Sequence, residues 1–272
     1  MLYQTIRANN WNDLVKEKEK LQQTGDDWIF RGQNNSSWLF ESSLERAMRR
    51  FNSAWEDATR IEGGLLRRFQ RQAQQYISAL PDASNYIEWL ALMQHYGAPT
   101  RLLDWTHSFY VAMFFALDGA DPGTDTAVWS LNWTEVWEKL PPAIMALSNA
   151  DRNLQKPKSF EQVLFGKDKF VIKIAPFRFN DRLILQQGTF LAPSNVHFPF
   201  WKYLEESLKA AKSGTLKKFE ISHKAQGTML EELFDMNLTR ATLFPGLEGF
   251  SRSLSTMLAI PKILVPPENR PR

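Results

Sequence analysis

The chain of 272 residues contains no cysteine. This absence excludes disulfide bonds, catalytic thiolates and cysteine-ligated metal sites, and it fits a reducing compartment. No stretch approaches about 18 consecutive apolar residues, and the N-terminus lacks an apolar signal region, so we expect a soluble cytoplasmic protein without a membrane partner. The four histidines lack the spacing of metal ligands and no HExxH motif occurs, so we expect no metal cofactor.

An excess of charge of one sign is also missing, because the formal net charge is only +3. Such a balance gives the chain no general affinity for nucleic acid or acidic membranes, although local basic patches could still bind them. The sequence has neither a glycine-rich phosphate loop nor the G-x-S-x-G motif of many hydrolases. It is instead rich in apolar residues, with 43% hydrophobic residues and ten tryptophans, which is typical of a folded chain with a large core.

One local basic bias lies within residues 45–71. Its arginines are Arg46, Arg49, Arg50, Arg60, Arg67, Arg68 and Arg71, and the acids among them are Glu45, Glu56, Asp57 and Glu62. Because the acids dilute the positive charge, we interpret the segment mainly as a solvated helical face. Nucleic-acid contact is the less favoured alternative, and it would use Arg46, Arg49, Arg50, Arg67, Arg68 and Arg71.

Helical and strand periodicities alternate along the chain without the regular spacing of a doubly wound sheet. Helices are predicted over residues 10–23, 42–51, 65–80, 86–96 and 108–117, and strands over 28–33, 100–105, 126–131, 170–174 and 216–222. Ser42 and Glu45 stand three apart as a capping box at the start of the second helix. We predict the α+β class, with one domain over residues 1–265 and a mixed or antiparallel central sheet. An N-terminal helical insertion would span about residues 42–95, and residues 266–272 would form a disordered tail.

The predicted strand over residues 28–33 carries an arginine on an otherwise apolar face. Ile29, Arg31 and Gln33 share that face, because side chains alternate along a strand. Burying an unpaired guanidinium is costly, so Arg31 either pairs with an internal acid, for which Asp104 is the candidate, or faces a cleft that holds an anion. Gly32 beside it would let a ligand approach the backbone closely.

The predicted strand that ends in "LLDWT" provides the second set of polar residues. Asp104 and Thr106 fall on one face of it, and the following helix begins near Thr106 and Ser108 with free backbone amides that suit an anion. The plainer interpretation makes the hydroxyl groups helix caps and Asp104 a hydrogen-bond anchor. His95, at the end of a buried helix, is more often bonded to the backbone than catalytic.

Four blocks of the sequence resemble the FRG domain family, which is named for the triplet seen here as Phe30, Arg31 and Gly32. The blocks are "WIFRGQ", "QHYGAPTRLLDWTHSFYVAMFFA", "RLILQQGTFLAP" and "TLFPGLEG", and they occur in this order. The chain is also distantly similar to arginine-class ADP-ribosyltransferases, which implies a split sheet. In the third block, Gln186 and Gln187 stand where those enzymes carry a catalytic glutamate.

The resemblance implies an NAD-dependent ADP-ribosyltransferase or NAD glycohydrolase, with NAD as substrate, acting as a toxin or phage-defence effector of bacterial type. The catalytic candidates are Arg31, Asp104 and Gln187, and the NAD-binding candidates are Arg31, Gly32, Gln33, His95, Tyr96, Arg101, Thr106 and Tyr110. Catalysis itself stays open. A non-catalytic domain that recognises a nucleotide or nucleic acid, and a purely structural arginine network, are the alternatives.

Overall fold

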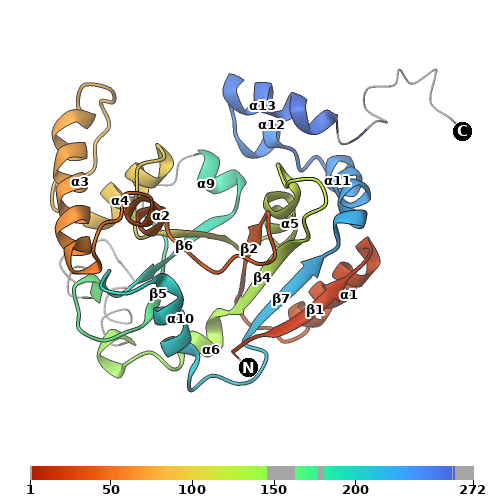
Figure 1. Ribbon diagram of the computed structural model, residues 1–272, viewed down its shortest axis with the longest axis horizontal. Helices are drawn as coiled ribbons and strands as arrows, with labels where there is room; N and C mark the ends of the chain where they lie inside the picture. The colour runs from red at the N-terminus through yellow and green to blue at the C-terminus, as the bar shows by residue number, and fades with distance from the viewer. Residues whose placement is uncertain (1, 146–162, 177–180, 259, 261–272) are drawn as a thin grey trace, which may run out of the picture.

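The computed structural model describes residues 2–145, 163–176, 181–258 and 260. In these residues seven strands form one sheet in the order β1-β7-β4-β2-β3-β6-β5 (Figure 1). The strands are β1 Gln4–Ala8, β2 Trp28–Gln33, β3 Leu103–Thr106, β4 Thr126–Asn132, β5 Val171–Ile174, β6 Gly188–Pro193 and β7 Leu216–Ile221. The β1–β7 pair is parallel and the other pairs are antiparallel. This arrangement confirms the predicted α+β class with a mixed sheet. The predicted tail, residues 266–272, lies outside the described residues.

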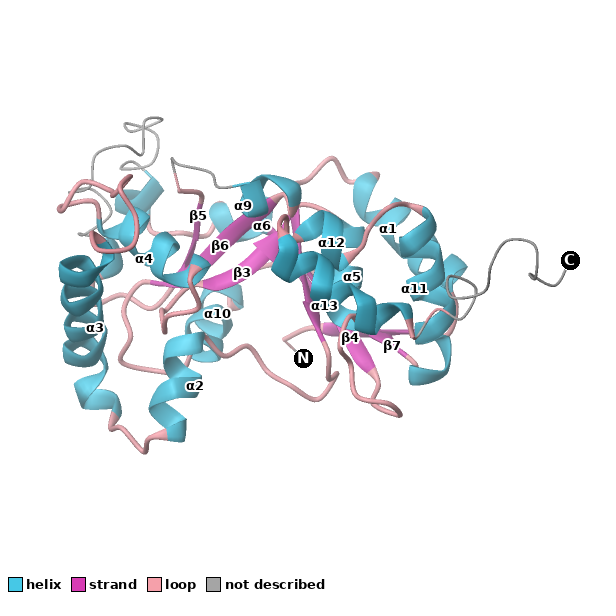
Figure 2. Ribbon diagram, turned by 90° about the horizontal axis from the view of Figure 1, so that it is seen from above, coloured by secondary structure: helices cyan, strands magenta, loops and turns pink. Residues whose placement is uncertain are grey.

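Helices cover both sides of this sheet. They are α1 Trp11–Gln22, α2 Ser43–Arg50, α3 Ala58–Ala73, α4 Tyr86–His95, α5 Phe109–Leu117, α6 Trp133–Trp137, α9 Asp181–Leu185, α10 Phe200–Leu208, α11 Gln226–Asp235, α12 Arg240–Leu243 and α13 Leu247–Met257. Three of them, α2, α3 and α4, lie between β2 and β3 in the chain and stand together at one end of the molecule (Figure 2).

The predicted start of α2 agrees with the structure, whereas the predicted limits of α3 do not. The side chains of Ser42 and Glu45 form the predicted capping box at the start of α2. The helix predicted over residues 65–80 is instead α3, which begins at Ala58 and ends at Ala73, so Tyr76 lies beyond it and is 80% exposed. The predicted limits differ from the observed ones because helix propensity alone is a weak signal.

Alternating side chains give the sheet two hydrophobic cores. Phe30, Val128 and Phe219 pack with α1, α5 and α11 on the side that we call the α5 face. Ile29 and Trp129 belong to the other core, with α10 on the opposite side, the α10 face. Helices cover both sides of the sheet, so apolar side chains are needed on both faces of its central strands.

The sheet is split between β2 and β3. β2 pairs with β4 along all six of its residues, but it pairs with β3 only where Phe30 lies opposite Thr106. Beyond that pair the two strands diverge, and the guanidinium of Arg31 donates a hydrogen bond to the main-chain carbonyl of Asp104 at the point of divergence. This weak pairing leaves Arg31 and Asp104 on the facing edges of the two strands.

A charged cluster holds the other end of the split together. Asp27, just before β2, lies 3.4 Å from the ring of His107, just after β3, and also forms an ion pair with Lys173 of β5. The hydrogen bond from His107 and the charge of Lys173 lower the pKa of Asp27 to about 2, although burial of the carboxylate opposes the shift. This cluster therefore joins three strands where the backbone ladder ends.

Asp27→Asn is expected to lower the free energy of unfolding at pH 7 by about 1 kcal/mol, which allows for solvent screening of a carboxylate that is 40% exposed. The folded pKa lies below the ordinary value of 3.8, so the carboxylate stabilises the fold above about pH 4, and this contribution is lost as the pH falls towards 2. Urea unfolding of both proteins at about pH 7 and about pH 2.5 measures the difference. An equal difference at both pH values would contradict the ionic role.

Candidate functional site

Arg31 and Asp104 project from opposite faces of the sheet. Phe30 lies opposite Thr106, so these two residues share the α5 face, together with Asp104 two residues earlier on β3. Arg31 is one residue away from Phe30 and projects from the α10 face. Of the two alternatives for Arg31, the ion pair with the Asp104 side chain is not formed, since Arg31 contacts the main-chain carbonyl of Asp104 and not its carboxylate. The single cleft predicted for both residues is replaced by two separate sites.

Asp104 lies at the wall of a cavity of about 350 Å³ between α4, α9 and strands β3 and β6. Its Oδ2 accepts a hydrogen bond of 2.9 Å from Nε2 of Gln94. The Oε1 of Gln94 accepts one of 2.6 Å from the hydroxyl of Thr100, which fixes the orientation of the amide. Asp104 is exposed, and Oδ1 accepts no hydrogen bond from a described residue, so one carboxylate oxygen is positioned and the other is available.

Arg182 of α9 is the cation of this cavity, and the sequence analysis missed it. Its guanidinium lies 4.4 Å from the ring centre of Phe244 and donates no hydrogen bond to a described residue. Burial lowers the pKa of Arg182, and the nearby negative charge of Asp104 opposes that shift. Arg182 is the first residue of the block "RLILQQGTF", so its position could have marked it as a candidate, but only Gln186 and Gln187 of that block were considered.

The remaining polar wall residues include one predicted candidate. His95 lines the cavity, and burial together with the charge of Arg182 lowers its pKa, so its ring is neutral at pH 7. Gln186 also lines the cavity, and its Nε2 donates to the carbonyl of Leu243 at 3.0 Å. Tyr96 is exposed and lies outside the cavity wall. The other wall residues are Ala79, Pro81, Glu88, Ala91, Leu92, Pro176, Leu183 and Phe190.

The two residues that follow Arg31 line the same groove as Arg31 does and also have internal contacts. A Cβ atom on Gly32 would lie 2.1 Å from the carbonyl oxygen of Ala112, so Gly32 permits α5 to pack on the strand. Gln33 is buried, and its side chain accepts a hydrogen bond from the indole of Trp129 and donates one to the carbonyl of Leu39. Helix packing therefore explains the glycine of the triplet.

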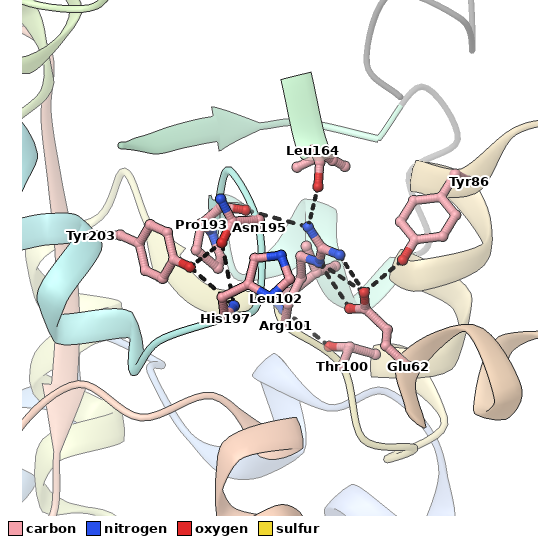
Figure 3. Close-up of polar contacts among 10 residues, drawn as sticks. All are labelled: Glu62, Tyr86, Thr100, Arg101, Leu102, Leu164, Pro193, Asn195, His197 and Tyr203. Carbon is pink, nitrogen blue, oxygen red and sulfur yellow. Dashed lines mark hydrogen bonds and ion pairs between the residues drawn. The ribbon is translucent and has the colours of Figure 1, made fainter. Parts of the chain in front are cut away.

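Arg101 is also internal and not a ligand contact. Its side chain and that of Glu62 are each 1% exposed and form an ion pair (Figure 3). Arg101 donates further to the carbonyl of Leu164 at 2.7 Å, while the hydroxyl of Tyr86 donates to Glu62 at 2.7 Å. Burial alone lowers the pKa of Arg101, but the charge and hydrogen bonds of Glu62 outweigh it and raise the pKa above its usual value.

The last three candidates lie away from the cavity or serve the backbone. Thr106 donates to the carbonyl of Gln186 at 2.6 Å and accepts from the amide of Ser108, so its hydroxyl ties β3 to the segment before β6. Tyr110 stacks on Trp11 of α1 at 5.6 Å and does not line the cavity. Gln187 is exposed and does not line the cavity, where its neighbour Gln186 stands instead.

Residues 26–125 match the FRG domain, which confirms the resemblance for this part of the chain. The matched region contains the Arg31 triplet, Gln94 and Asp104, whereas Arg182 lies beyond it. No curated protein and no solved structure matches the chain. Among the described residues, no helix is both long enough and apolar enough to span a membrane, and no group of three or more histidine, aspartate or glutamate side chains gathers as a metal site.

Proposed function

We propose that this chain, with its FRG domain at residues 26–125, takes NAD as a substrate and breaks the nicotinamide–ribose bond in the Asp104 cavity. One observation carries the proposal: Gln94 holds one oxygen of the Asp104 carboxylate and leaves the other facing a cavity that also presents Arg182. A volume of about 350 Å³ is enough for the reacting half of a dinucleotide and lies within the range of small-molecule sites.

The chemistry would proceed through the ribose carbon C1′. The bond from C1′ to the nicotinamide nitrogen breaks, and its electron pair leaves with nicotinamide and neutralises the pyridinium charge. The free Asp104 oxygen stabilises the positive charge that develops on the ribose. Water or an acceptor then bonds to C1′ and gives its proton to the same carboxylate. Water gives NAD glycohydrolase activity, and a protein or nucleic-acid acceptor gives ADP-ribosyl transfer.

Phosphate binding and support of Asp104, which the sequence analysis assigned to Arg31 alone, would be divided between Arg182 and Arg31. Arg182 would hold the phosphates, because it lines the Asp104 cavity and its guanidinium has no hydrogen-bond partner among the described residues. Arg31 acts as a positioning residue, since its hydrogen bond holds the main chain of β3 at Asp104. Consumption of NAD would be the effector activity of the toxin or defence role that the resemblance implies.

Asp104→Asn is expected to reduce nicotinamide release from NAD by at least about 100-fold, because it removes the charge and the proton acceptor together. Asn can still accept the Gln94 hydrogen bond, so the fold should persist. Chromatographic quantification of nicotinamide measures the rate, and NAD-dependent thermal stabilisation measures binding. Glu205→Gln, which removes an exposed carboxylate paired with Lys202 on α10, serves as the matched control. Unchanged release by the Asp104 variant would refute this role.

Gln186 and Gln187 favour a second candidate function, which is nucleotide binding without catalysis. Gln186 donates to a backbone carbonyl and Gln187 is exposed, so the segment before β6 contributes no carboxylate to the cavity wall. Such a site would recognise a nucleotide without converting it. Thermal stabilisation by NAD with no release of nicotinamide and no labelled product in a cell lysate would select this function over the enzymatic one.

A further inference from the structure

The Arg31 side of the sheet opens on a groove that the proposed NAD site does not use. The groove has a volume of about 1190 Å³ and lies on the α10 face, opposite the Asp104 side chain. The end of β2, the segment 34–41, helix α2, the segment 52–55 and the beginning of α10 form its walls. Because the groove shares no lining residue with the Asp104 cavity, it can bind a different ligand.

Indole side chains give this groove a surface for stacking. Trp38 is 54% exposed and Leu39 beside it is also largely exposed, although both are large apolar residues. Trp55 and Trp201 line the groove and are partly exposed. An exposed indole in a groove that is also lined by arginines suits a flat, unpaired ring such as a nucleobase.

Guanidinium groups stand beside these rings. Arg31, Arg46 and Arg49 line the groove. The Nε of Arg31 is buried and has no hydrogen-bond partner in the described part of the chain. Burial lowers the pKa of Arg31 to about 10, and the like charge of Arg46 adds to the effect against the opposing charge of Asp104. Two neighbouring cations with an unused donor are complementary to an anion such as a phosphate.

The fold buries two of the four acids that dilute this basic region in the sequence, while Glu56 and Asp57 stay at least partly exposed and Glu41 pairs with Arg49 in the groove wall. Glu45 is buried and accepts hydrogen bonds from the backbone amides of Ser42 and Phe200. Glu62 is buried against Arg101. Four outward arginines on α2 and α3 have no ion-pair partner among the described residues: Arg50, Arg67, Arg68 and Arg71. The two helices stand side by side in Figure 2, so this part of the surface is more basic than its composition suggests.

We infer that the groove binds single-stranded nucleic acid, with a base stacked on Trp38 and backbone phosphates held by Arg31 and Arg46. A single strand fits better than a duplex, because only an unpaired base offers its ring to an exposed indole. The outward arginines of α2 and α3 add a favourable field for the approach of the strand. This site lies on the opposite face of the sheet from the Asp104 carboxylate and does not depend on NAD chemistry.

Fluorescence anisotropy with a labelled oligothymidylate of about 20 nucleotides tests the inference. The intact chain should bind at about 50 mM salt and more weakly at about 200 mM. Trp38→Ala should weaken binding at least about 5-fold, as expected for the loss of one base–aromatic stack. Arg46→Gln should weaken binding and reduce the steepness of the salt dependence by about 0.7, the value for one phosphate contact on a single strand.

Matched controls lie on α13, which occupies another part of the molecule (Figure 1). Phe250→Ala removes an aromatic ring of similar exposure, 51%, and Arg252→Ala removes an exposed arginine. Both should leave binding unchanged, and thermal unfolding should show that all four variants fold. The inference would be overturned by no saturable binding at about 50 mM salt, by unchanged affinity of Trp38→Ala, or by equally tight binding of a duplex.

Discussion

Replacing Arg101 with methionine is expected to lower the free energy of unfolding by about 3–5 kcal/mol, the range for a buried charge that loses its partner. Glu62 would remain 1% exposed with only the hydroxyl of Tyr86 to compensate it. The carbonyl of Leu164 would also lose its donor. Urea denaturation followed by tryptophan fluorescence measures the change.

Two further variants distinguish the energetics of the buried Arg101–Glu62 pair from those of an exposed ion pair. The double variant Glu62→Leu with Arg101→Met should recover most of the lost stability, because no uncompensated charge remains. Asp57→Asn, which breaks the exposed ion pair with Arg60, should cost at most about 1 kcal/mol. If Arg101→Met were as stable as the original chain, or if the double variant were no better than the single one, the structural role of Arg101 would be refuted.

Replacing Gly32 with alanine is expected to destabilise the fold by about 3 kcal/mol or more, because the added methyl group overpacks a backbone contact. The new Cβ would lie 2.1 Å from the carbonyl oxygen of Ala112 and 2.5 Å from the amide nitrogen of Ala116. Neither atom belongs to a flexible side chain, so α5 itself would have to move away from β2. The loss is measured by urea or thermal unfolding.

Gly64→Ala is the matched control on helix α3. A Cβ there meets no atom within 4 Å, and a glycine inside a helix is a weaker helix former than alanine. This variant should gain about 0.5–1 kcal/mol. A Gly32→Ala protein that unfolds at the same urea concentration as the original would show that β2 and α5 are not in the close contact described.

The three residues of the triplet therefore have different roles. Phe30 packs in the core of the α5 face, and Gly32 lets α5 approach the same face. Arg31 projects from the α10 face, where it holds the carbonyl of Asp104 and lines the groove. A loss of function on mutation of Phe30 or Gly32 would thus report on folding, whereas Arg31 links the edge of the split to a ligand surface.

Local patterns in the sequence were sufficient for several features of this protein. The capping box at Ser42 and Glu45 marks the start of α2, and a segment that is apolar on every side is the buried helix α5. Alternation within β2 placed Ile29 and Arg31 on one face. These features depend on hydrogen bonds and periodicities that extend over a few residues, so they can be read without knowing the fold.

The tertiary structure alone decided how these pieces face one another. The register that sets Phe30 opposite Thr106 puts Arg31 and Asp104 on opposite faces, and a shift of one residue would have reversed this outcome. The burial of Glu62 against Arg101 likewise joins a helix to a distant segment. The short edge strand β1 was missed because its partner, β7, comes near the other end of the chain. Register and pairing arise from contacts between distant parts of the chain, and no local period encodes them.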